Sequence, residues 1–339
     1  MKRLSINKPI SVSTLIFLFY SFGAYSDNDA DFEQWKKEFK IYALANGVSE
    51  ETYLKTIPNV KFLPKVIEYD RFQPEFYEDT KTYISKRTSE AKVKKGLEFY
   101  KNNKVLIDEI ATKYEVDKEL LLALMGIETN FGTYVGKMDI LSSLATLSFD
   151  KRRSDFFSNE LLILLKLIDR DLVNYETLFG SWAGAFGFFQ FMPSTIDSYA
   201  IDYNNDKFID LKNPIDAYAS AANYLNKIGW SNNEPCYYKI DLNKNIPKKY
   251  LNVSAKKLNN KNKIKFFKKF INNYSELNLT TESSLSAIIT PDKDIIPDAE
   301  TLNPAYIVFD NYEVILKWNR SLRFGLAVCT LKDMFKNEL

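Results

Sequence analysis

Residues 126–132 read GIETNFG, and they end an almost wholly apolar run, VDKELLLALM, at residues 116–125. The spacing of the apolar residues predicts a helix that begins after Asp117, its expected N-cap, and ends near Thr129. Gly132 is the expected stop beyond the last turn. A helix that is apolar on most sides is expected to be buried.

Glu128 is the residue that does not fit a purely structural helix. Burying a carboxylate at the end of an apolar run is costly unless the group has a partner or a task. The helix dipole and apolar neighbours such as Met125 and Phe131 both favour the protonated carboxyl near neutral pH. A protonated carboxyl suits a general acid acting on a glycosidic oxygen. The structural alternative is a helix-terminal glutamate that simply faces water.

The composition excludes several classes of enzyme. The chain has 339 residues, with 46 basic and 44 acidic side chains, so no excess of positive charge draws it to nucleic acid. It contains no histidine, which excludes Ser-His-Asp and Cys-His catalysis and imidazole metal ligands. Acid–base chemistry near neutral pH then falls to carboxylates with shifted pKa values, or to Lys, Tyr or Cys side chains.

The N-terminus predicts export from the cytoplasm. Basic residues near the start precede an apolar stretch at residues 10–24, and small residues follow it at 24–26. This pattern is typical of a signal peptide, which we place at residues 1–26. A retained membrane anchor is the alternative, although the apolar stretch is short for a bilayer span. No cysteine lies near the cleavage site, so we expect a periplasmic protein and not a lipoprotein.

The rest of the chain divides by pattern into four parts. We expect an N-terminal helical lobe at residues 27–80, a helical core at 81–230, a small β-containing lobe at 231–309 and a C-terminal segment at 310–339 that returns to the helical body. The longest expected helix covers residues 89–116. The C-terminal segment reads as strand-like and then as helix.

The chain has two cysteines, Cys236 and Cys329. In an oxidising compartment they would be able to pair, but the sequence does not show how far apart they lie. Two buried free thiols are the alternative.

A second stretch, GSWAGAFGFFQFMPST at residues 180–195, combines small residues with aromatic ones. Small residues let a ligand or another backbone approach closely. Gln190 is a lone amide among aromatic side chains, well suited to holding one polar group of a flat, hydroxylated ligand. Pro193 fits the first turn of a new helix. The alternative is a tightly packed contact between two helices.

A third stretch, residues 202–216, follows the first positions of an EF-hand loop, which binds a cation through oxygen ligands. Two positions depart from that pattern, because Lys207 stands at the usual glycine and Asn213 at the usual bidentate glutamate. A longer loop would bring in a carboxylate three residues later. The alternative is a solvated acidic turn. The candidate ligands are Asp202, Asn204, Asp206, the backbone carbonyl of Phe208, and Asp216.

These stretches occur in an order and spacing that resemble one known family. GIETNFG, LATLSFDKRRSDFF, GSWAGAFGFFQFMPST and DYNNDKFIDLKNPIDAYASAANYL together resemble the membrane-bound lytic murein transglycosylase B family, including its soluble periplasmic forms. The resemblance is dense from residue 83 to residue 230 and resumes at NYEVILKWNRSLRFGLAV, residues 311–328. It implies a mainly α (α+β) fold, in which a lysozyme-like helical core is flanked by a helical lobe and a small β lobe.

The resemblance also implies an activity and a set of site residues. The implied reaction cleaves the β-1,4 bond between N-acetylmuramic acid and N-acetylglucosamine in peptidoglycan without water, with Glu128 as the catalytic acid and base. Trp318 and Phe324 stand where tyrosines are expected. The loop at 202–216 implies a structural Ca²⁺ or Na⁺, and the chemistry needs no cofactor. The implied substrate-binding residues are Tyr83, Arg152, Arg153, Ser181, Gln190, Phe191, Tyr224, Trp318, Asn319 and Phe324.

The residues themselves favour the same reaction. Glycoside hydrolases usually need two carboxylates, yet the motifs near Glu128 contain no second acid. One carboxylate is enough if the muramoyl 6-hydroxyl attacks C1 and gives a 1,6-anhydro sugar. A muramidase that hydrolyses the same bond, or a non-catalytic peptidoglycan-binding protein, are the alternatives. We expect a monomer that acts on glycan strands, and the sequence leaves open any cell-wall synthesis or division partner.

Overall fold

The computed structural model describes residues 21–72, 77–232, 234–279, 282–293 and 302–339, with only the backbone for residues 21–27. Most of the expected signal peptide, residues 1–26, therefore lies outside the described residues. Across the described ranges, no helix combines the length and the apolar character needed to span a bilayer.

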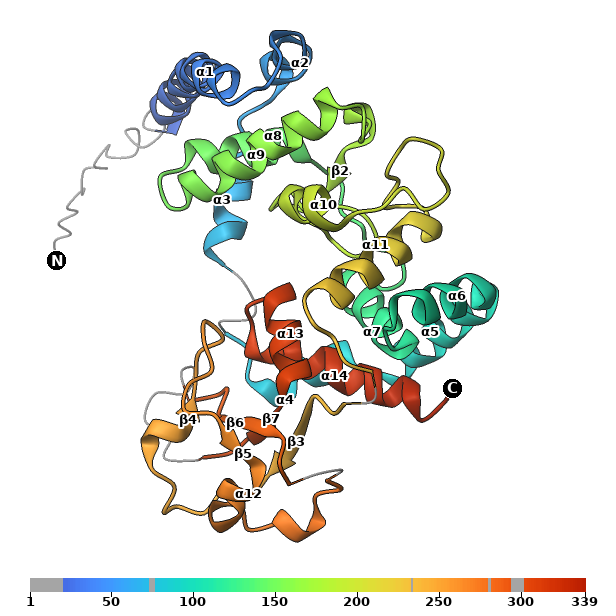
Figure 1. Ribbon diagram of the computed structural model, residues 1–339. Coiled ribbons are helices and arrows are strands. Elements are labelled where there is room, and N and C mark those ends of the chain that lie inside the picture. The colour runs from blue at the N-terminus through green and yellow to red at the C-terminus, as the bar shows by residue number, and fades with distance from the viewer. Residues whose placement is uncertain (1–20, 73–76, 233, 280–281, 294–301) are drawn as a thin grey trace, which may run out of the picture.

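Most of the described chain is helical, and α1 lies at one end of the molecule (Figure 1). The first are α1 (Ser21–Ala45), α2 (Glu50–Thr56), α3 (Pro64–Arg71), α4 (Thr80–Arg87), α5 (Glu90–Asn102), α6 (Lys104–Tyr114) and α7 (Lys118–Thr129). The next are α8 (Ile140–Phe149), α9 (Ser154–Asp169), α10 (Pro193–Tyr199), α11 (Pro214–Lys227), α12 (Ile264–Phe267), α13 (Asp310–Trp318) and α14 (Leu322–Lys336). Short 3-10 turns lie at Ile57–Asn59, Tyr175–Thr177, Lys248–Tyr250, Lys268–Phe270 and Tyr274–Glu276.

Helix α7 lies in the interior of the helical body. It packs against α5 and α6, which precede it in sequence, and against α11 and α14 from later parts of the chain. Its residues from Leu120 to Gly126 are all buried, as the apolar run at 116–125 predicts. The expected helix end near Thr129 is confirmed, because Asn130 takes the left-handed conformation that ends a helix.

The strands are short, and most of them belong to one sheet. In the helical body, β1 (Met138–Asp139) pairs with β2 (Phe179–Gly180). The larger sheet runs in the order β3-β7-β6-β4, and β5 pairs with β6. Only the β4–β6 pair is parallel. The strands of this larger sheet are β3 (Tyr237–Ile240), β4 (Leu251–Asn252), β5 (Asn262–Lys263), β6 (Leu285–Ile289) and β7 (Ala305–Val308).

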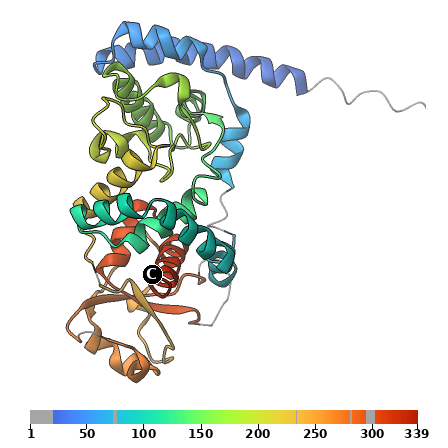
Figure 2. The ribbon, with the colours of Figure 1, turned by 90° about the vertical axis from the view of Figure 1, so that its right-hand side faces the viewer.

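The larger sheet has its own apolar core, which joins strand residues such as Ile240 and Ile307 to Phe267 of α12. Both views place this β lobe at one end of the molecule and α1 at the other (Figures 1 and 2). The expected mainly α class with a small β-containing part is confirmed.

The β lobe is joined to the helical body covalently and by hydrogen bonds. Cys236 and Cys329 form a disulfide with 6.1 Å between their Cα atoms, which settles the alternative that the sequence left open. This disulfide fastens the segment before β3 to α14. Asn311 holds together the two ends of the chain segment that forms the β lobe, residues 231 and 311. Its side-chain amide accepts the Ser231 N–H at 3.0 Å and donates to the Ser231 carbonyl at 2.8 Å.

A buried ion pair forms a second connection between the lobe and the body. The Asp292 carboxylate, just after β6, accepts the Thr80 backbone N–H at 2.9 Å and an Arg323 guanidinium N–H at 3.1 Å. The three groups come from the β lobe, the start of α4 and α14, and all three residues are buried. One carboxylate therefore ties three segments that are far apart in sequence.

Three local expectations are wrong in whole or in part. The helix expected at 89–116 breaks at Asn103, whose side-chain amide bonds to the Phe99 carbonyl and competes with the helix. Asp117 occupies the expected N-cap position of α7, but its side chain makes no capping hydrogen bond, and its carboxylate accepts the Trp230 indole N–H at 2.9 Å. The strand-like start of the C-terminal segment is helix α13, since an apolar run alone does not distinguish a buried helix from a strand.

Candidate active site

Glu128 lies on the last turn of α7, where the buried helix reaches the surface. Six of the seven residues before it are fully buried, whereas Glu128 is only partly buried. Asn130 and Phe131 follow with φ of 49° and 57°, and both of their N–H groups donate to the Met125 carbonyl. The chain therefore stops the helix sharply and leaves the carboxyl of Glu128 at its rim.

Trp318 holds this carboxyl from the far end of the sequence. Its indole N–H donates to Oε1 of Glu128 at 3.0 Å, across a sequence separation of 190 residues. Trp318 is the last residue of α13. The hydrogen bond fixes the direction of the acid, which the sequence did not predict.

An aromatic cluster surrounds the indole of Trp318. The Tyr224 ring stacks on it at 5.0 Å, and the Phe191 ring meets it edge-on at 5.4 Å. Tyr199 stacks on the other side of Tyr224 at 4.4 Å. Burial raises the pKa of Tyr224 to about 12, so its phenol stays neutral and donates to the Lys317 carbonyl. Tyr224 and Trp318 are both partly exposed, and Trp318 links this cluster to Glu128.

Two lysines from α5 bind the C-terminal end of α7. Lys92 Nζ donates to the Gly126 carbonyl at 2.8 Å, and Lys95 Nζ donates to the Asn130 carbonyl at 2.8 Å. Burial lowers the pKa of Lys92, and the charges of Arg87 and Lys95 lower it further. Cations at a helix C-terminus satisfy its free carbonyls and offset its negative dipole. The lysines therefore support the turn that carries Glu128.

The loop from β2 to α10 carries Ser181 and Gln190. Ser181 closes a tight turn, because its N–H donates to the Ala185 carbonyl and its Oγ accepts the Ala185 N–H. Gln190 has φ of 50°, and its side-chain NH₂ donates to the carbonyls of Gly187 and Val135 at 2.9 and 3.3 Å. Both side chains are partly exposed, so each has surface to offer a ligand.

This loop is tied to the turn that follows Glu128. Thr129 Oγ1 donates to the Phe188 carbonyl at 2.8 Å, and β1 pairs with β2 on the other side. Gly136 is needed here, because a Cβ at this position would collide with the carbonyl of Gly180. The structure thus brings Glu128, Ser181 and Gln190 into one region from two separate motifs. Within the second motif, Gly184 lies against the Leu144 side chain of α8 and Gly187 against Leu211, so these small residues serve close packing of the loop.

Three of the expected aromatic site residues lie in the interior. Tyr83, Phe191 and Phe324 are 1%, 2% and 3% exposed, so protein atoms cover their rings. The Arg87 guanidinium covers Tyr83 at 3.5 Å from the ring centroid. The expectation that these three rings stack on sugars is therefore corrected, because a covered ring has no free face in this conformation. Phe191 instead supports Trp318 and Tyr224 from beneath, whereas Asn319 beside Trp318 is partly exposed.

Arg152 and Arg153 hold a buried carboxylate. Arg152 donates to Asp70 Oδ2 and to the Asp70 carbonyl at 2.6 and 2.7 Å, and Arg153 binds the other carboxylate oxygen. Both guanidinium groups remain partly exposed. Asp70 was not singled out from the sequence, and no signal there links it to the RR pair. The pair therefore ties α3 to the start of α9, and its exposed edges are what remains for a substrate.

The loop at 202–216 is folded by its own acceptor side chains. Asp202 accepts the backbone N–H groups of Asp206 and Lys207, and Asp206 accepts that of Phe208. Lys207 has φ of 79°, so it adopts the conformation for which an EF-hand uses glycine. The backbone thus fits the cation loop in spite of this substitution.

The late carboxylate of this loop is Asp216, at the start of α11. It is fully buried and accepts the Tyr203 and Asp210 N–H groups at 2.8 and 2.9 Å. Burial raises the pKa of Asp216. Within the described residues, no three acidic or cysteine side chains come together closely enough to hold a metal ion. The donors share one loop, but the cation site remains a prediction.

Comparisons with known proteins agree with the motifs. The family described as Transglycosylase SLT domain matches residues 31–333. Membrane-bound lytic murein transglycosylase B of Escherichia coli (strain K12) is 38% identical over 149 residues, which are 44% of this chain and 41% of that protein. The match therefore spans less than half the length of this curated relative.

Two solved structures are similar over most of this chain. SltB3 from Pseudomonas aeruginosa, in complex with NAG-NAM-pentapeptide, has 31% identity and a TM-score of 0.78, and the match covers 90% of this chain and 79% of that chain. The Escherichia coli lytic transglycosylase Slt35, in complex with calcium, has 25% identity and a TM-score of 0.72, with 92% and 94% covered. The expected family resemblance is confirmed, and the chain belongs to the Transglycosylase SLT domain family.

Proposed function

We propose that this protein is a peptidoglycan lytic transglycosylase that cleaves the β-1,4 bond between N-acetylmuramic acid and N-acetylglucosamine. The observation that carries the proposal is a single carboxyl, Glu128, held by the Trp318 indole at the rim of the Ser181–Gln190 loop. The two loops that frame it, residues 130–137 and 180–191, contain no acid. A hydrolase of the usual kind would need a second carboxylate there.

The reaction takes two proton transfers by the same residue. Glu128 first protonates the glycosidic oxygen, which leaves with the N-acetylglucosamine side of the strand. The resulting carboxylate then takes the proton from the 6-hydroxyl of the muramoyl sugar, whose oxygen attacks C1. The product is a 1,6-anhydro-muramoyl sugar, and no water enters. The Trp318 N–H donates to Oε1 of Glu128 and so orients the carboxyl for both proton transfers.

The surrounding side chains bind the glycan in this proposal. Tyr224 and Trp318 offer partly exposed rings to the apolar faces of the sugars. Ser181, Gln190 and Asn319 supply hydrogen-bonding groups for hydroxyl and acetamido oxygens or nitrogens. SltB3 from P. aeruginosa binds NAG-NAM-pentapeptide, which supports a substrate of this chemistry.

Product analysis tests the proposal and separates it from its two rivals. Purified sacculi are incubated with the protein, and the soluble products are measured by mass spectrometry. We expect anhydro-muropeptides from the wild-type chain and none from Glu128→Gln. Products that are one water heavier would identify a muramidase. Binding to sacculi without any soluble product would identify a non-catalytic binding protein.

We also propose that the protein works in the periplasm after removal of residues 1–26. The Cys236–Cys329 disulfide supports an oxidising compartment, because such bonds are rare in reducing cytosol. N-terminal sequencing of the protein recovered from a periplasmic fraction tests both points. A mature chain that still begins at Met1 would contradict the signal peptide.

The loop at 202–216 is proposed to bind a structural Ca²⁺. Asp202, Asn204, Asp206, the carbonyl of Phe208, and Asp216 would hold the ion. Its role would be to neutralise the carboxylates and rigidify the loop, and no step of the cleavage passes through it. The complex of Slt35 with calcium supports the choice of cation.

A further inference from the structure

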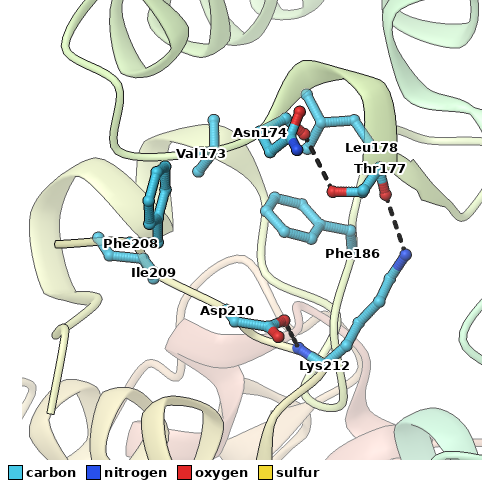
Figure 3. A pocket seen from close by; sticks show the side chains of 9 residues that line it. All are labelled: Val173, Asn174, Thr177, Leu178, Phe186, Phe208, Ile209, Asp210 and Lys212. Atoms are coloured by element: carbon cyan, nitrogen blue, oxygen red, sulfur yellow. Dashed lines mark hydrogen bonds between the residues drawn. The ribbon is translucent and has the colours of Figure 1, made fainter. Parts of the chain in front are cut away.

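A cavity that does not include Glu128 lies between residues 173–178 and the loop at 202–216. It has a volume of about 560 Å³, which is in the range of small-ligand pockets. None of the residues that line it belongs to the proposed glycan-binding set. Figure 3 shows its lining residues: Val173, Asn174, Thr177, Leu178, Phe186, Phe208, Ile209, Asp210 and Lys212.

The cavity sits behind the loop that carries Ser181 and Gln190. Phe186, which lines it, belongs to that loop and pairs through its backbone with Phe191 on the other side of the turn. Leu178 lies directly before β2, which leads into Ser181. An occupant would therefore contact the glycan-binding loop at Phe186, and not at Ser181 or Gln190.

The floor of the cavity is apolar. Val173, Leu178 and Phe186 are at most 5% exposed, so their inner faces form a fixed hydrophobic surface. Phe208 stands over this floor with half of its surface exposed, and Ile209 follows it (Figure 3). Exposed aromatic surface of this kind gains when an aliphatic group covers it. The floor is therefore suited to a short aliphatic side chain.

Two opposite charges stand at one edge of the cavity. Lys212 Nζ donates one of its three hydrogens to the Thr177 carbonyl at 3.0 Å, which leaves two for a ligand (Figure 3). Asp210 accepts the Lys212 backbone N–H on Oδ1 at 2.9 Å, which leaves Oδ2 as a strong acceptor. A neutral sugar would meet the two groups only with hydroxyl hydrogen bonds, whereas a ligand with both an ammonium and a carboxylate would pair with both charges. A simple anion would be attracted by Lys212 and repelled by Asp210.

We propose that this cavity binds a short peptide that carries a carboxylate and an ammonium group beside a small aliphatic side chain. The carboxylate pairs with Lys212, the ammonium with Asp210, and the aliphatic group lies on the Val173–Phe186 floor. The inference rests on the proposed function, because peptidoglycan carries peptides on its glycan strands. The site would let the enzyme sense the peptide part of its substrate separately from the glycan.

The test measures binding of the free pentapeptide, without sugars, to the full chain by isothermal titration calorimetry. The Glu128→Gln variant is used as the parent protein, called the host, for all measurements, so that no substrate is turned over. We expect saturable binding that weakens about fivefold in Lys212→Met, the size of effect that a partly exposed ion pair supplies. Lys227→Met, an exposed lysine on α11 away from the cavity, should bind as the host does.

Modified peptides assign each charge. On the host, a C-terminally amidated pentapeptide should bind about fivefold more weakly than the unmodified pentapeptide. On Lys212→Met, the two peptides should bind with equal affinity, because the amide and the substitution remove the same ion pair. An N-acetylated pentapeptide, with all amino groups blocked, should show the same relation to Asp210→Asn. The melting temperature of each variant shows whether the fold is intact.

The outcomes are separable from those of the proposed function. No heat of binding at millimolar peptide, or equal affinity for the host and Lys212→Met, would overturn the peptide site. Cleavage of sacculi by the wild-type chain is measured independently. If the peptide binds as expected but sacculi are not cleaved, the peptide site stands and the proposed activity falls.

Discussion

The end of α7 and the loop at 202–216 solve a similar problem in different ways. Each turns the chain through non-glycine residues with positive φ, Asn130 and Phe131 in one and Asn205 and Lys207 in the other. The end of α7 carries one acid, Glu128, and the loop carries several. At the end of α7, however, the partners are side chains from distant helices, whereas the carboxylates of the loop accept N–H groups of the loop itself.

The difference in partners predicts a difference in what each region responds to. Lys92, Lys95 and Trp318 supply positive charge and a hydrogen-bond donor to the end of α7, so the chain alone completes that region. The loop gathers acidic groups at its ligand positions, and Asp216 among them is fully buried. We therefore expect changes at α7 to alter chemistry, and changes at the loop to alter stability.

The largest expected effect comes from removing the proton of the acid. Glu128→Gln keeps the shape and the oxygen that accepts the Trp318 N–H, but it cannot donate a proton. Turnover of sacculi should fall at least about a hundredfold, with melting temperature and sacculus binding near those of the wild type. More than about one per cent residual turnover would show that Glu128 is not the acid.

The second effect concerns the hydrogen bond to that acid. Trp318→Phe keeps a ring between Phe191 and Tyr224 but removes the N–H that binds Glu128. We expect kcat to fall by roughly ten- to a hundredfold, the cost of a lost hydrogen bond to a charged group. An unchanged kcat would mean that the indole does not position the acid.

Trp318→Ala separates the binding role of this ring from a packing role. A ring used mainly for packing would cost roughly 3–5 kcal/mol of unfolding free energy when truncated. A ring used mainly for binding would raise KM with little change in melting temperature. Both quantities should be measured on the same purified variant.

The third effect belongs to the loop and should leave the chemistry alone. Calcium at a hundred times its dissociation constant should stabilise the fold by about 2.7 kcal/mol relative to EDTA, if it binds only the folded chain. Melting temperatures in the two conditions measure this, and the effect should vanish in Asp206→Asn. Equal melting curves in calcium and EDTA would favour the solvated acidic turn. A lower kcat in EDTA while the protein stays fully folded would show that the loop affects chemistry as well as stability.

The smallest effect tests the cations at the end of α7. Lys92→Met keeps the length of the side chain but removes the charge that binds the Gly126 carbonyl. We expect kcat to fall by roughly two- to fivefold with KM unchanged, in line with a charge at a helix terminus. Lys94→Met, exposed on the same helix, is the control, and Lys92→Arg should restore activity. Equal kinetics in Lys92→Met and Lys94→Met would remove Lys92 from the support of the acid.

The sequence predicts most of the local features and few of the long-range ones. The apolar run at 116–125, the stop after Thr129 and the turn start at Pro193 depend on neighbours in sequence, and the structure has all three. The contact between Trp318 and Glu128 joins residues that local patterns treat separately, so only the family resemblance placed them together. The same reason hid the pairing of the two cysteines.

Other residues that support the site were not predicted, because their residue types are common in this sequence. Lys92 and Lys95 lie in a lysine-rich helix, and nothing in their spacing separates them from Lys94, which faces water. Asp70 is an ordinary acid in sequence, although two arginines surround it in the fold. The family resemblance implied Tyr83 and Phe324 as substrate-binding residues, yet both are buried. Aromatic residues suit both a core and a sugar platform, and only burial decides between the two roles.

The clamp that Asn311 forms with Ser231 has a consequence for how this architecture can change in evolution. Because the chain departs and returns at nearly the same point, the helical body meets the β lobe as if it were one long loop with its ends already joined. Lengthening such a loop adds little closure entropy. Insertions or deletions within the lobe would therefore leave the geometry around the acid in place, so long as the junction, the Cys236–Cys329 disulfide and the contacts of Asp292 with Thr80 and Arg323 are kept.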